Sequence, residues 1–261
     1  MNRGLVILGL LLLTACGSIK TKSTSEPESQ DQLLLATLWF EKSAEMKALY
    51  YQCYNNAEAA LTENLARGDR DKPAAVVLDI DETVLDNSPF QGWQILKGEN
   101  FSQEDWGRWV DMAMAAPLPG AVEFTRFADS LGVEVFYISN RTTAQFASTI
   151  ANMTALGFAD ADSTHLLLRG SSSSKVERRA EIEKGYEILL LIGDNLADLD
   201  SVFERRGDDL GFADVETRKG LFGRRYIILP NPMYGTWLSE LLKKASGETT
   251  HDKLMNSTVG F

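Results

Sequence analysis

Residues 76–87 read VVLDIDETVLDN, an apolar run that passes directly into a group of acids. The β-branched start predicts a buried strand that ends at Asp79. Four carboxylates follow in close succession, at Asp79, Asp81, Glu82 and Asp86. Like charges this close together repel one another unless a cation neutralises them. The stretch therefore predicts a strand end that binds a cation.

The same strand signal recurs along the chain and alternates with helical periodicity. Strands are expected at residues 74–79, 133–138, 165–168, 187–192 and 226–229. Helices are expected at about residues 102–114, 120–131, 142–156, 175–184 and 196–205. Nearly continuous apolar strands separated by helices predict an α/β fold, with a parallel sheet covered on both faces.

Polar side chains follow three of these strands. Asp79, Ser139 and Asp194 each lie just past a predicted strand. In parallel sheets, ligands bind in the crevice outside the carboxyl ends of the strands. We therefore expect these three side chains to converge on one crevice.

Composition limits the classes of protein to which the chain can belong. Its 261 residues are 44% hydrophobic and 24% charged, which is enough for one sizeable α/β core. The formal net charge of −11 argues against nucleic acid as a partner, because nucleic-acid binding requires a basic face. An anionic substrate would have to be attracted by a local site rather than by the whole protein.

The N-terminus has the features of a targeting segment. Arg3 precedes an apolar stretch, residues 5–13, that is too short to span a bilayer comfortably. The following LTAC ends in Cys16 and resembles a bacterial lipobox. We expect residues 1–15 to be a lipoprotein signal peptide and Cys16 to carry acyl chains such as palmitate; a plain secretory signal is the alternative. Gly17 favours the outer membrane if the host is Gram-negative.

Polar segments separate this N-terminus and the C-terminus from one domain. Residues 16–31 are polar and Ser/Thr-rich, as expected of a flexible tether. The domain is expected over residues 32–246, with helical additions at about 32–67 and 86–118. The polar tail, residues 247–261, is expected to be loose.

Motifs at successive strand ends carry a family resemblance. They are DIDETVLDN (79–87), YISNR (137–141), SSSSKVERR (171–179) and IGDNLADLD (192–200). In this order they resemble the four motifs of the haloacid dehalogenase superfamily of aspartate-nucleophile phosphatases. Together with PNPMYGTW (230–237) and the lipobox, they are similar to the class C acid phosphatases, the lipoprotein e family of 5′-nucleotidases.

This resemblance implies a Rossmann-like parallel sheet flanked by helices, with an added, mainly helical subdomain. It also implies Mg²⁺-dependent hydrolysis of phosphomonoesters, nucleoside monophosphates above all. Small phosphate esters are then the expected partners, at a bacterial cell envelope to which the lipid on Cys16 anchors the protein. Two alternatives stay open, a phosphotransferase of the same superfamily and a non-catalytic binding lipoprotein.

The resemblance also implies roles for the acids. Asp79 is the expected nucleophile, forming an aspartyl-phosphate, and Asp81 is the expected general acid and base. Mg²⁺ prefers oxygen ligands, which Asp79, the backbone carbonyl of Asp81, and Asp194 would supply. Asp198 would bind the metal directly or through a water molecule.

A second set of residues is expected to bind the phosphate. Ser139 would donate its hydroxyl, and the backbone N–H groups of Asn140 and Arg141 would help from a helix N-terminus. Lys175 opens a predicted helix, where its charge opposes the helix dipole unless an anion lies between them. A solvated basic helix is the alternative for Lys175.

Aromatic residues are concentrated in the insertion at 86–118, namely Phe90, Trp93, Phe101, Trp106 and Trp109. The resemblance places Trp106 at the mouth of the site, opposite Tyr234. Two facing aromatic rings would stack on a nucleobase without reading its identity. Helical spacing alone favours core packing for Trp106 and Trp109.

Several conspicuous residues are expected to be structural. Arg178 and Arg179 are interpreted as surface or structural charges, and Asp200 as an acid in the first turn of a helix. His165 is the only histidine within the domain and is expected to be structural. Cys53 lies in a helix with apolar periodicity and has no expected disulfide partner, so it is interpreted as a buried, inert thiol.

Overall fold

The computed structural model describes residues 31–68 and 70–260 of the chain. The expected signal peptide and Cys16 lie outside the described residues, as does the tether up to residue 30. Within the two described ranges, none of the helices has the length and apolar character that a membrane span requires.

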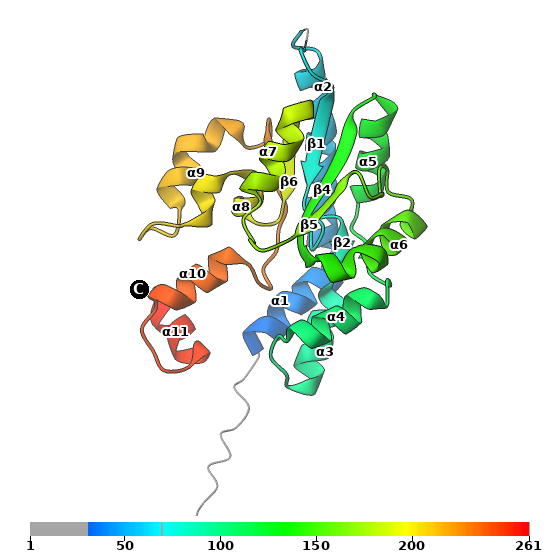
Figure 1. Cartoon of the computed structure of the whole chain (residues 1–261). Helices are drawn as coiled ribbons and strands as arrows, with labels where there is room; N and C mark the ends of the chain where they lie inside the picture. The colour runs from blue at the N-terminus through cyan, green and yellow to red at the C-terminus, as the bar shows by residue number, and fades with distance from the viewer. Residues whose placement is uncertain (1–30, 69, 261) are drawn as a thin grey trace, which may run out of the picture.

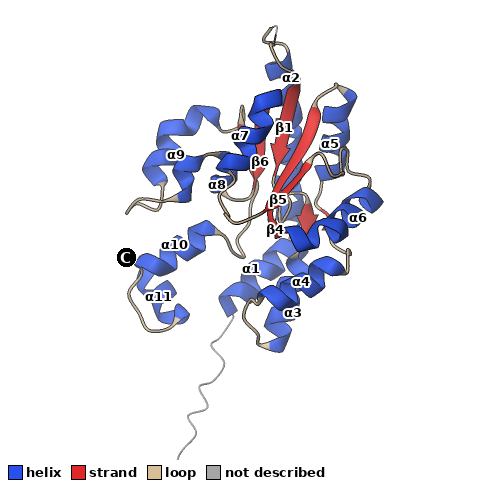
Figure 2. Cartoon of the chain, in the orientation of Figure 1, coloured by secondary structure: helices blue, strands red, loops and turns tan. Residues whose placement is uncertain are grey.

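A five-stranded parallel sheet forms the centre of the fold, with strand order β5-β4-β1-β6-β7. Its strands are β1 (Ala74–Leu78), β4 (Glu134–Thr142), β5 (Leu166–Arg169), β6 (Glu187–Gly193) and β7 (Tyr226–Ile228). All five strands expected from apolar runs are therefore present. Figure 2 shows the sheet with helices on either side of it.

The two faces of the sheet are built by alternate residues of each strand. In β1, Val76 and Leu78 join a core with α2 (Ala44–Leu65) and α5 (Ala121–Ser130). Their neighbours Ala75 and Val77 pack on the other face, with residues of α7 (Val176–Gly185) and α8 (Leu196–Leu199). A sheet covered on both faces needs apolar side chains at every position, which explains the continuous apolar run.

A helical subdomain lies at one end of the sheet, where Figure 1 shows α1, α3 and α4 grouped together. Its helices are α1 (Asp31–Lys42), α3 (Ser88–Lys97) and α4 (Gln103–Asp111). The short strands β2 (Leu85–Asp86) and β3 (Ala116–Pro117) pair in antiparallel fashion and join the two ends of the inserted segment. The added helical subdomain expected from the resemblance is thus present.

The remaining helical elements include several that the periodicity did not predict. The full set of these remaining elements is η1 (Thr143–Gln145), α6 (Phe146–Leu156), η2 (Ser201–Glu204), α9 (Phe212–Arg218), η3 (Lys219–Leu221) and α10 (Thr236–Lys244). Those that the periodicity did not predict are α9, η3 and α10. The helix expected at 196–205 is divided into α8 and η2, because Asp200 between them is extended, with φ −153°. Helix α3 lies within the helical addition expected at about 86–118, but the periodicity did not place it as a separate helix, since its sequence SPFQGWQILK contains a proline and a glycine.

The expectation of a loose C-terminal tail is wrong, because residues of this tail form α11 (Thr250–Ser257). A reciprocal capping box starts the helix: the Thr249 side chain accepts the Asp252 N–H, and the Asp252 side chain accepts the Thr249 N–H. Each bond satisfies a backbone donor that the helix itself leaves free. In Figure 1, α11 follows α10 beside the helical subdomain.

Candidate active site

The carboxyl ends of the central strands surround a cavity of about 460 Å³. Acids, bases, amides and aromatic rings line it: Asp79, Asp81, Gln91, Gln94, Phe101, Gln103, Trp106, Asn140, Arg141, Arg169, Lys175, Asp194, Asn195, Asp198, Tyr234 and Gly235. Of the three side chains expected to converge here, Asp79 and Asp194 line the cavity, whereas the Ser139 side chain does not and instead contacts Asp81. Three basic side chains, Arg141, Arg169 and Lys175, offset most of the negative charge of the four aspartates in this lining.

The four acids of the opening stretch divide into two pairs. Asp79 and Asp81 line the cavity, whereas Glu82 is buried and Asp86 is half-buried, both outside the cavity lining. Glu82 is fully buried at φ +56°, and its Oε1 accepts the Asn87 N–H at 2.8 Å. Burial raises the pKa of Glu82 well above its ordinary value. Asp86 accepts the Ser88 N–H at 2.8 Å, at the start of α3. These two acids shape the loop between β1 and α3.

Three carboxylates gather at the base of the cavity. Asp79, Asp194 and Asp198 each place an oxygen within 4.8 Å of the other two. Burial raises the pKa of Asp79 to about 7, with the charge of Asp198 adding to the shift and that of Lys175 opposing it. Burial, followed by the charge of Asp198, raises the pKa of Asp194 well above its ordinary value. Three crowded oxygen donors fit a divalent cation such as Mg²⁺, which would stabilise their charged forms.

The residues Gly193, Asp194 and Asn195 at the carboxyl end of β6 allow Asp198 to lie close to Asp194. Asp198 Oδ2 accepts the Asn195 N–H at 3.0 Å, in the capping box that begins α8. A Cβ atom on Gly193 would lie 2.5 Å from the Cβ of Asp198, closer than real Cβ contacts. The glycine is therefore needed for Asp198 to reach Asp194.

Lys175 enters the same group as a buried cation. Its Nζ pairs with Asp79 and lies 2.7 Å from Asp198 Oδ1. The side chain makes no capping hydrogen bond at the start of α7. Burial opposes its charge, but the two carboxylates outweigh burial and raise the pKa of Lys175. The alternative of a solvated basic helix is thus wrong for Lys175, which is 5% exposed. Its phosphate-binding role stays a prediction.

Asp81 lies to one side, held by hydrogen-bond donors. Its Oδ1 accepts from Arg141 Nε at 2.9 Å and from Asn87 Nδ2 at 3.0 Å. Its Oδ2 accepts from the Ser139 hydroxyl at 3.2 Å. Ser139 is buried and is not part of the cavity lining, so its hydroxyl serves Asp81 in this structure.

The expected helix N-terminus at Asn140 and Arg141 is wrong. Strand β4 continues to Thr142, and the helical turn starts at Thr143. The Arg141 N–H is donated to the Ser139 hydroxyl at 3.1 Å. Both residues still line the cavity, but the extended backbone of a strand replaces the helix start.

Arg178 and Arg179 are structural, one of the two roles expected for them. Arg178 donates to the Ser139 carbonyl at 2.6 Å and to Asn140 Oδ1 at 2.8 Å. Arg179 donates to the Asp198 carbonyl at 2.9 Å. The two guanidinium groups thus tie α7 to the last residues of β4 and to α8.

The aromatic residues of the insertion form a small core that also faces the cavity. Trp106 is 9% exposed and packs edge-to-face on Phe90, with ring centroids 5.2 Å apart. The ring centroid of Phe101 lies 6.4 Å from that of Trp106, and Phe101 is 61% exposed. Trp106 and Tyr234 both line the cavity, from α4 and from the loop before α10. Trp106 therefore has both features expected of it, core packing and a place at the site.

Comparison with known proteins identifies the family. A family model described as HAD superfamily, subfamily IIIB (Acid phosphatase) matches residues 14–237. The chain belongs to the subfamily IIIB acid phosphatases. The predicted haloacid dehalogenase superfamily and its fold are thereby confirmed.

Solved structures of this acid phosphatase group are similar over nearly the whole domain. The class C acid phosphatase from Bacillus anthracis superimposes with a TM-score of 0.82 and is 38% identical, covering 88% of this chain and 98% of that chain. The structure of the Bacillus anthracis class C acid phosphatase with tungstate bound gives a TM-score of 0.82 at 37% identity, with the same coverage.

Plant relatives are more distant. Acid phosphatase 1 of Solanum lycopersicum is 29% identical over 166 residues, which are 60% of this chain and 57% of that protein. Stem 31 kDa glycoprotein of Glycine max is 29% identical over 164 residues, 60% of this chain and 58% of that protein. The chain thus spans under two thirds of the length of these curated relatives.

Three polar residues at this site were missed by sequence reasoning. The Arg141 side chain and Asn87 both contact Asp81. Asn231 donates its Nδ2–H to Asp194 Oδ2 at 2.8 Å. Each of the three residues lies inside one of the motifs quoted above, so the motif indicated that the residue is near the site. The motif did not indicate which neighbour the side chain contacts.

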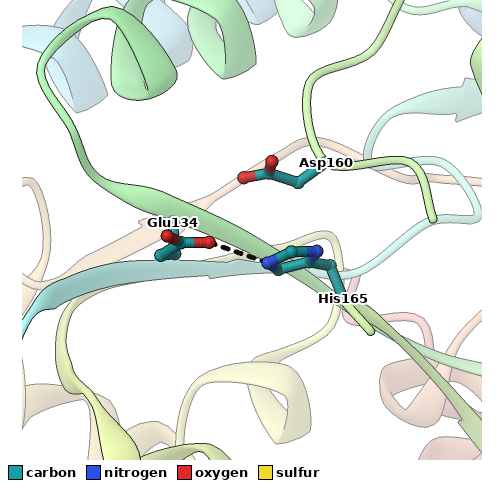
Figure 3. Close-up of side chains that lie close together, drawn as sticks. All are labelled: Glu134, Asp160 and His165. Atoms are coloured by element: carbon teal, nitrogen blue, oxygen red, sulfur yellow. Dashed lines mark hydrogen bonds and ion pairs between the residues drawn. The ribbon is translucent and has the colours of Figure 1, made fainter. Parts of the chain in front are cut away.

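His165 lies outside the cavity lining and is enclosed by carboxylates. Its Nε2 is 2.7 Å from Glu134 Oε2 and its Nδ1 is 2.9 Å from Asp162 Oδ1. Figure 3 shows the contact with Glu134, with Asp160 nearby. The two contacts link the start of β4 to the residues just before β5. The expected structural role for His165 agrees with this arrangement.

Proposed function

We propose that the protein is a Mg²⁺-dependent phosphomonoesterase that hydrolyses nucleoside monophosphates through an aspartyl-phosphate. One observation carries the proposal: the carboxylates of Asp79, Asp194 and Asp198 meet Lys175 in a cavity whose wall includes two aromatic rings. Acids, a buried cation and a stacking surface suit a phosphate, a metal and a base, respectively.

In the proposed mechanism Asp79 is the nucleophile. It follows β1 directly, and its carboxylate is restrained by Lys175 and by a 3.4 Å contact from the Thr83 hydroxyl. Mg²⁺, bound by Asp79, the Asp81 carbonyl and Asp194, with Asp198 directly or through water, would withdraw charge from the phosphoryl oxygens. Lys175 would offer its charge to the same oxygens, helped by Asn140, which lines the cavity. The predicted phosphate contact of Ser139 would require its hydroxyl to leave Asp81.

Asp81 is the proposed general acid and base. It would give a proton to the departing alkoxide and then accept one from the water that hydrolyses the intermediate. Its position supports this, because it lines the cavity two residues after the nucleophile without belonging to the three-carboxylate cluster.

A phosphate-release panel tests the proposal. Nucleoside monophosphates, sugar phosphates and glycerol phosphate would each be incubated with the purified protein, with and without Mg²⁺. We expect release in mildly acidic buffer that requires Mg²⁺, with nucleoside monophosphates preferred. Release that is seen only with an added alcohol acceptor would favour a phosphotransferase. Nucleotide binding without turnover would favour a binding lipoprotein.

Stacking by Trp106 and Tyr234 predicts a selective loss of affinity. Base stacking on an aromatic side chain contributes roughly 1–3 kcal/mol. Alanine at either position should therefore lower kcat/KM for nucleoside monophosphates by about 5- to 150-fold, with purines and pyrimidines affected together. Glycerol phosphate has no ring, so its hydrolysis should be unchanged in Tyr234→Ala and should fall less than that of nucleoside monophosphates in Trp106→Ala, because the Trp106 ring also contacts Arg141.

Trp93→Ala is a matched control for this measurement. Trp93 stacks on Phe90 in the same aromatic cluster, at a centroid distance of 5.9 Å, but does not line the cavity. Its loss should affect the melting temperature without changing the preference between the two substrates. If Trp106→Ala or Tyr234→Ala behaves like Trp93→Ala, the ring concerned is only a core residue.

We also propose that the protein is lipid-anchored at the outer membrane through Cys16. The lipobox before Cys16 supports this. Bacterial lipoproteins carry several acyl chains, and more than one chain is needed for stable membrane binding. The wild type should be labelled by a fatty-acid analogue and fractionate with membranes, whereas Cys16→Ser should be neither labelled nor retained. Unlabelled wild type in the soluble fraction would refute the anchor.

A further inference from the structure

Arg141 is a buried cation whose charge is directed at Asp81. The residue is 2% exposed, and within residues 31–68 and 70–260 its ion pair is with Asp81 alone. Both Nε and Nη2 contact the same oxygen, Asp81 Oδ1, at 2.9 and 2.8 Å. Burying a guanidinium group is costly unless it is paired, so this contact is what keeps Arg141 inside the protein.

The guanidinium group is itself fixed from three directions. Its Nη1 donates to Thr149 Oγ1 of α6 at 3.1 Å, and its Nη2 donates to Asn87 Oδ1 at 3.4 Å. The Trp106 ring of α4 lies over it, with Cζ 5.8 Å from the ring centroid. Arg141 therefore has one available position, set by β4, α6 and the helical subdomain together.

Asn87 adds to the restraint on the same carboxylate oxygen. Its Nδ2 donates to Asp81 Oδ1 at 3.0 Å, while its Oδ1 accepts from Trp109 Nε1 at 2.8 Å. Two N–H donors, Arg141 Nε and Asn87 Nδ2, thus hydrogen-bond to Oδ1, and Arg141 Nη2 makes an ion-pair contact with it, whereas Oδ2 contacts a single hydroxyl, that of Ser139. The two oxygens of Asp81 are not equivalent.

We infer that Arg141 is a positioning residue for general acid–base catalysis, which fixes Asp81 by Oδ1 so that Oδ2 carries the transferred proton. This inference rests on the proposed function and deepens it. In the first step a bond forms between an Asp79 oxygen and phosphorus, the ester P–O bond breaks, and Oδ2 gives its proton to the leaving oxygen. In the second step water attacks phosphorus, the Asp79–phosphorus bond breaks, and Oδ2 takes a proton from the water.

The inference predicts a dependence on the leaving group. An alkoxide is a poor leaving group and needs the proton, whereas p-nitrophenolate leaves readily without it. The value of kcat/KM covers the steps up to the first irreversible one, here the cleavage of the ester. A misplaced Asp81 should therefore reduce kcat/KM for an alkyl phosphate far more than for p-nitrophenyl phosphate.

The experiment compares glycerol phosphate with p-nitrophenyl phosphate in Arg141→Met. We expect kcat/KM to fall about 10²-fold for glycerol phosphate, at the lower end of the 10²–10⁴ range for a lost general acid, since Asp81 is still present. The loss on p-nitrophenyl phosphate should be less than about tenfold, and KM for glycerol phosphate should hardly change. Arg141→Lys keeps the charge with a single donor group and should recover part of the loss.

Two further variants guard against a general effect of the substitution. Arg67→Met removes an exposed arginine that pairs with Glu63, and both activities should be unchanged. Thr149→Val removes the acceptor of Arg141 Nη1 and should lower kcat/KM more for glycerol phosphate than for p-nitrophenyl phosphate, with a smaller loss than in Arg141→Met. This variant tests the inference if Arg141→Met does not fold.

Equal losses on both substrates would overturn the inference. If the equal losses come with a raised KM, Arg141 binds the phosphoryl group. If they come with a lowered melting temperature, Arg141 only stabilises the fold. A wild type that hydrolyses neither substrate would instead refute the proposed function.

Discussion

We expect Asp79→Asn to abolish turnover, lowering kcat by about 10⁴-fold or more, and to leave the fold intact. Asparagine has the shape of aspartate but cannot form an aspartyl-phosphate, and loss of a nucleophile leaves only the contributions of binding and electrostatics. The change also removes one of three crowded carboxylates and the acceptor charge beside Lys175. Phosphate release from a nucleoside monophosphate measures the effect, and the melting temperature checks the fold.

Asp86→Asn is the matched control, since it makes the same change in the same stretch. Asp86 accepts the Ser88 N–H, and the asparagine oxygen can accept that bond equally well. Its activity should therefore stay within a few-fold of wild type, because the side chain does not line the cavity. Wild-type turnover in purified Asp79→Asn would refute the nucleophile assignment.

The sheet and the place of the site were predictable because both depend on short-range pattern. Every strand of the sheet contains an apolar run, since both faces of the sheet are covered. The acids that stop the runs at Asp79 and Asp194 then mark the edge where a ligand binds. No long-range information was needed for either prediction.

The contacts around Asp81 were not predictable in this way. Asn87 and Arg141 are far apart in the sequence and meet because β1 and β4 are paired in parallel, which brings the segments at their carboxyl ends together. Whether a side chain faces the phosphate or a neighbouring acid depends on such packing. The sequence of the motif is identical in the two cases, so it does not distinguish them. Helix α11 was missed for a different reason: its apolar stripe is weak, and its N-terminal capping box is a local signal outside the periodicity.

Asp194→Ala should raise the Mg²⁺ concentration needed for half-maximal activity by at least about 10- to 100-fold and also lower kcat. Even outer partners of metal ligands alter metal affinity by about 10–100-fold, so a lost ligand should do no less. Asp194 is held by Asn231 through its side chain and by the Thr83 hydroxyl through its N–H. Its carboxylate is thus fixed toward Asp79 and Asp198, where no other acid of the cluster can replace it.

Asp200→Asn is the control for this loss, because it removes a charge six residues later in the same motif. The Asp200 carboxylate accepts from the Tyr226 hydroxyl at 2.9 Å and pairs with Arg218, away from the cavity lining. Its Mg²⁺ requirement should match that of wild type. EDTA should silence the wild type and added Mg²⁺ should restore it, with direct Mg²⁺ binding followed by calorimetry. Full activity in EDTA would mean that the three carboxylates and Lys175 neutralise one another without a metal and serve another chemistry.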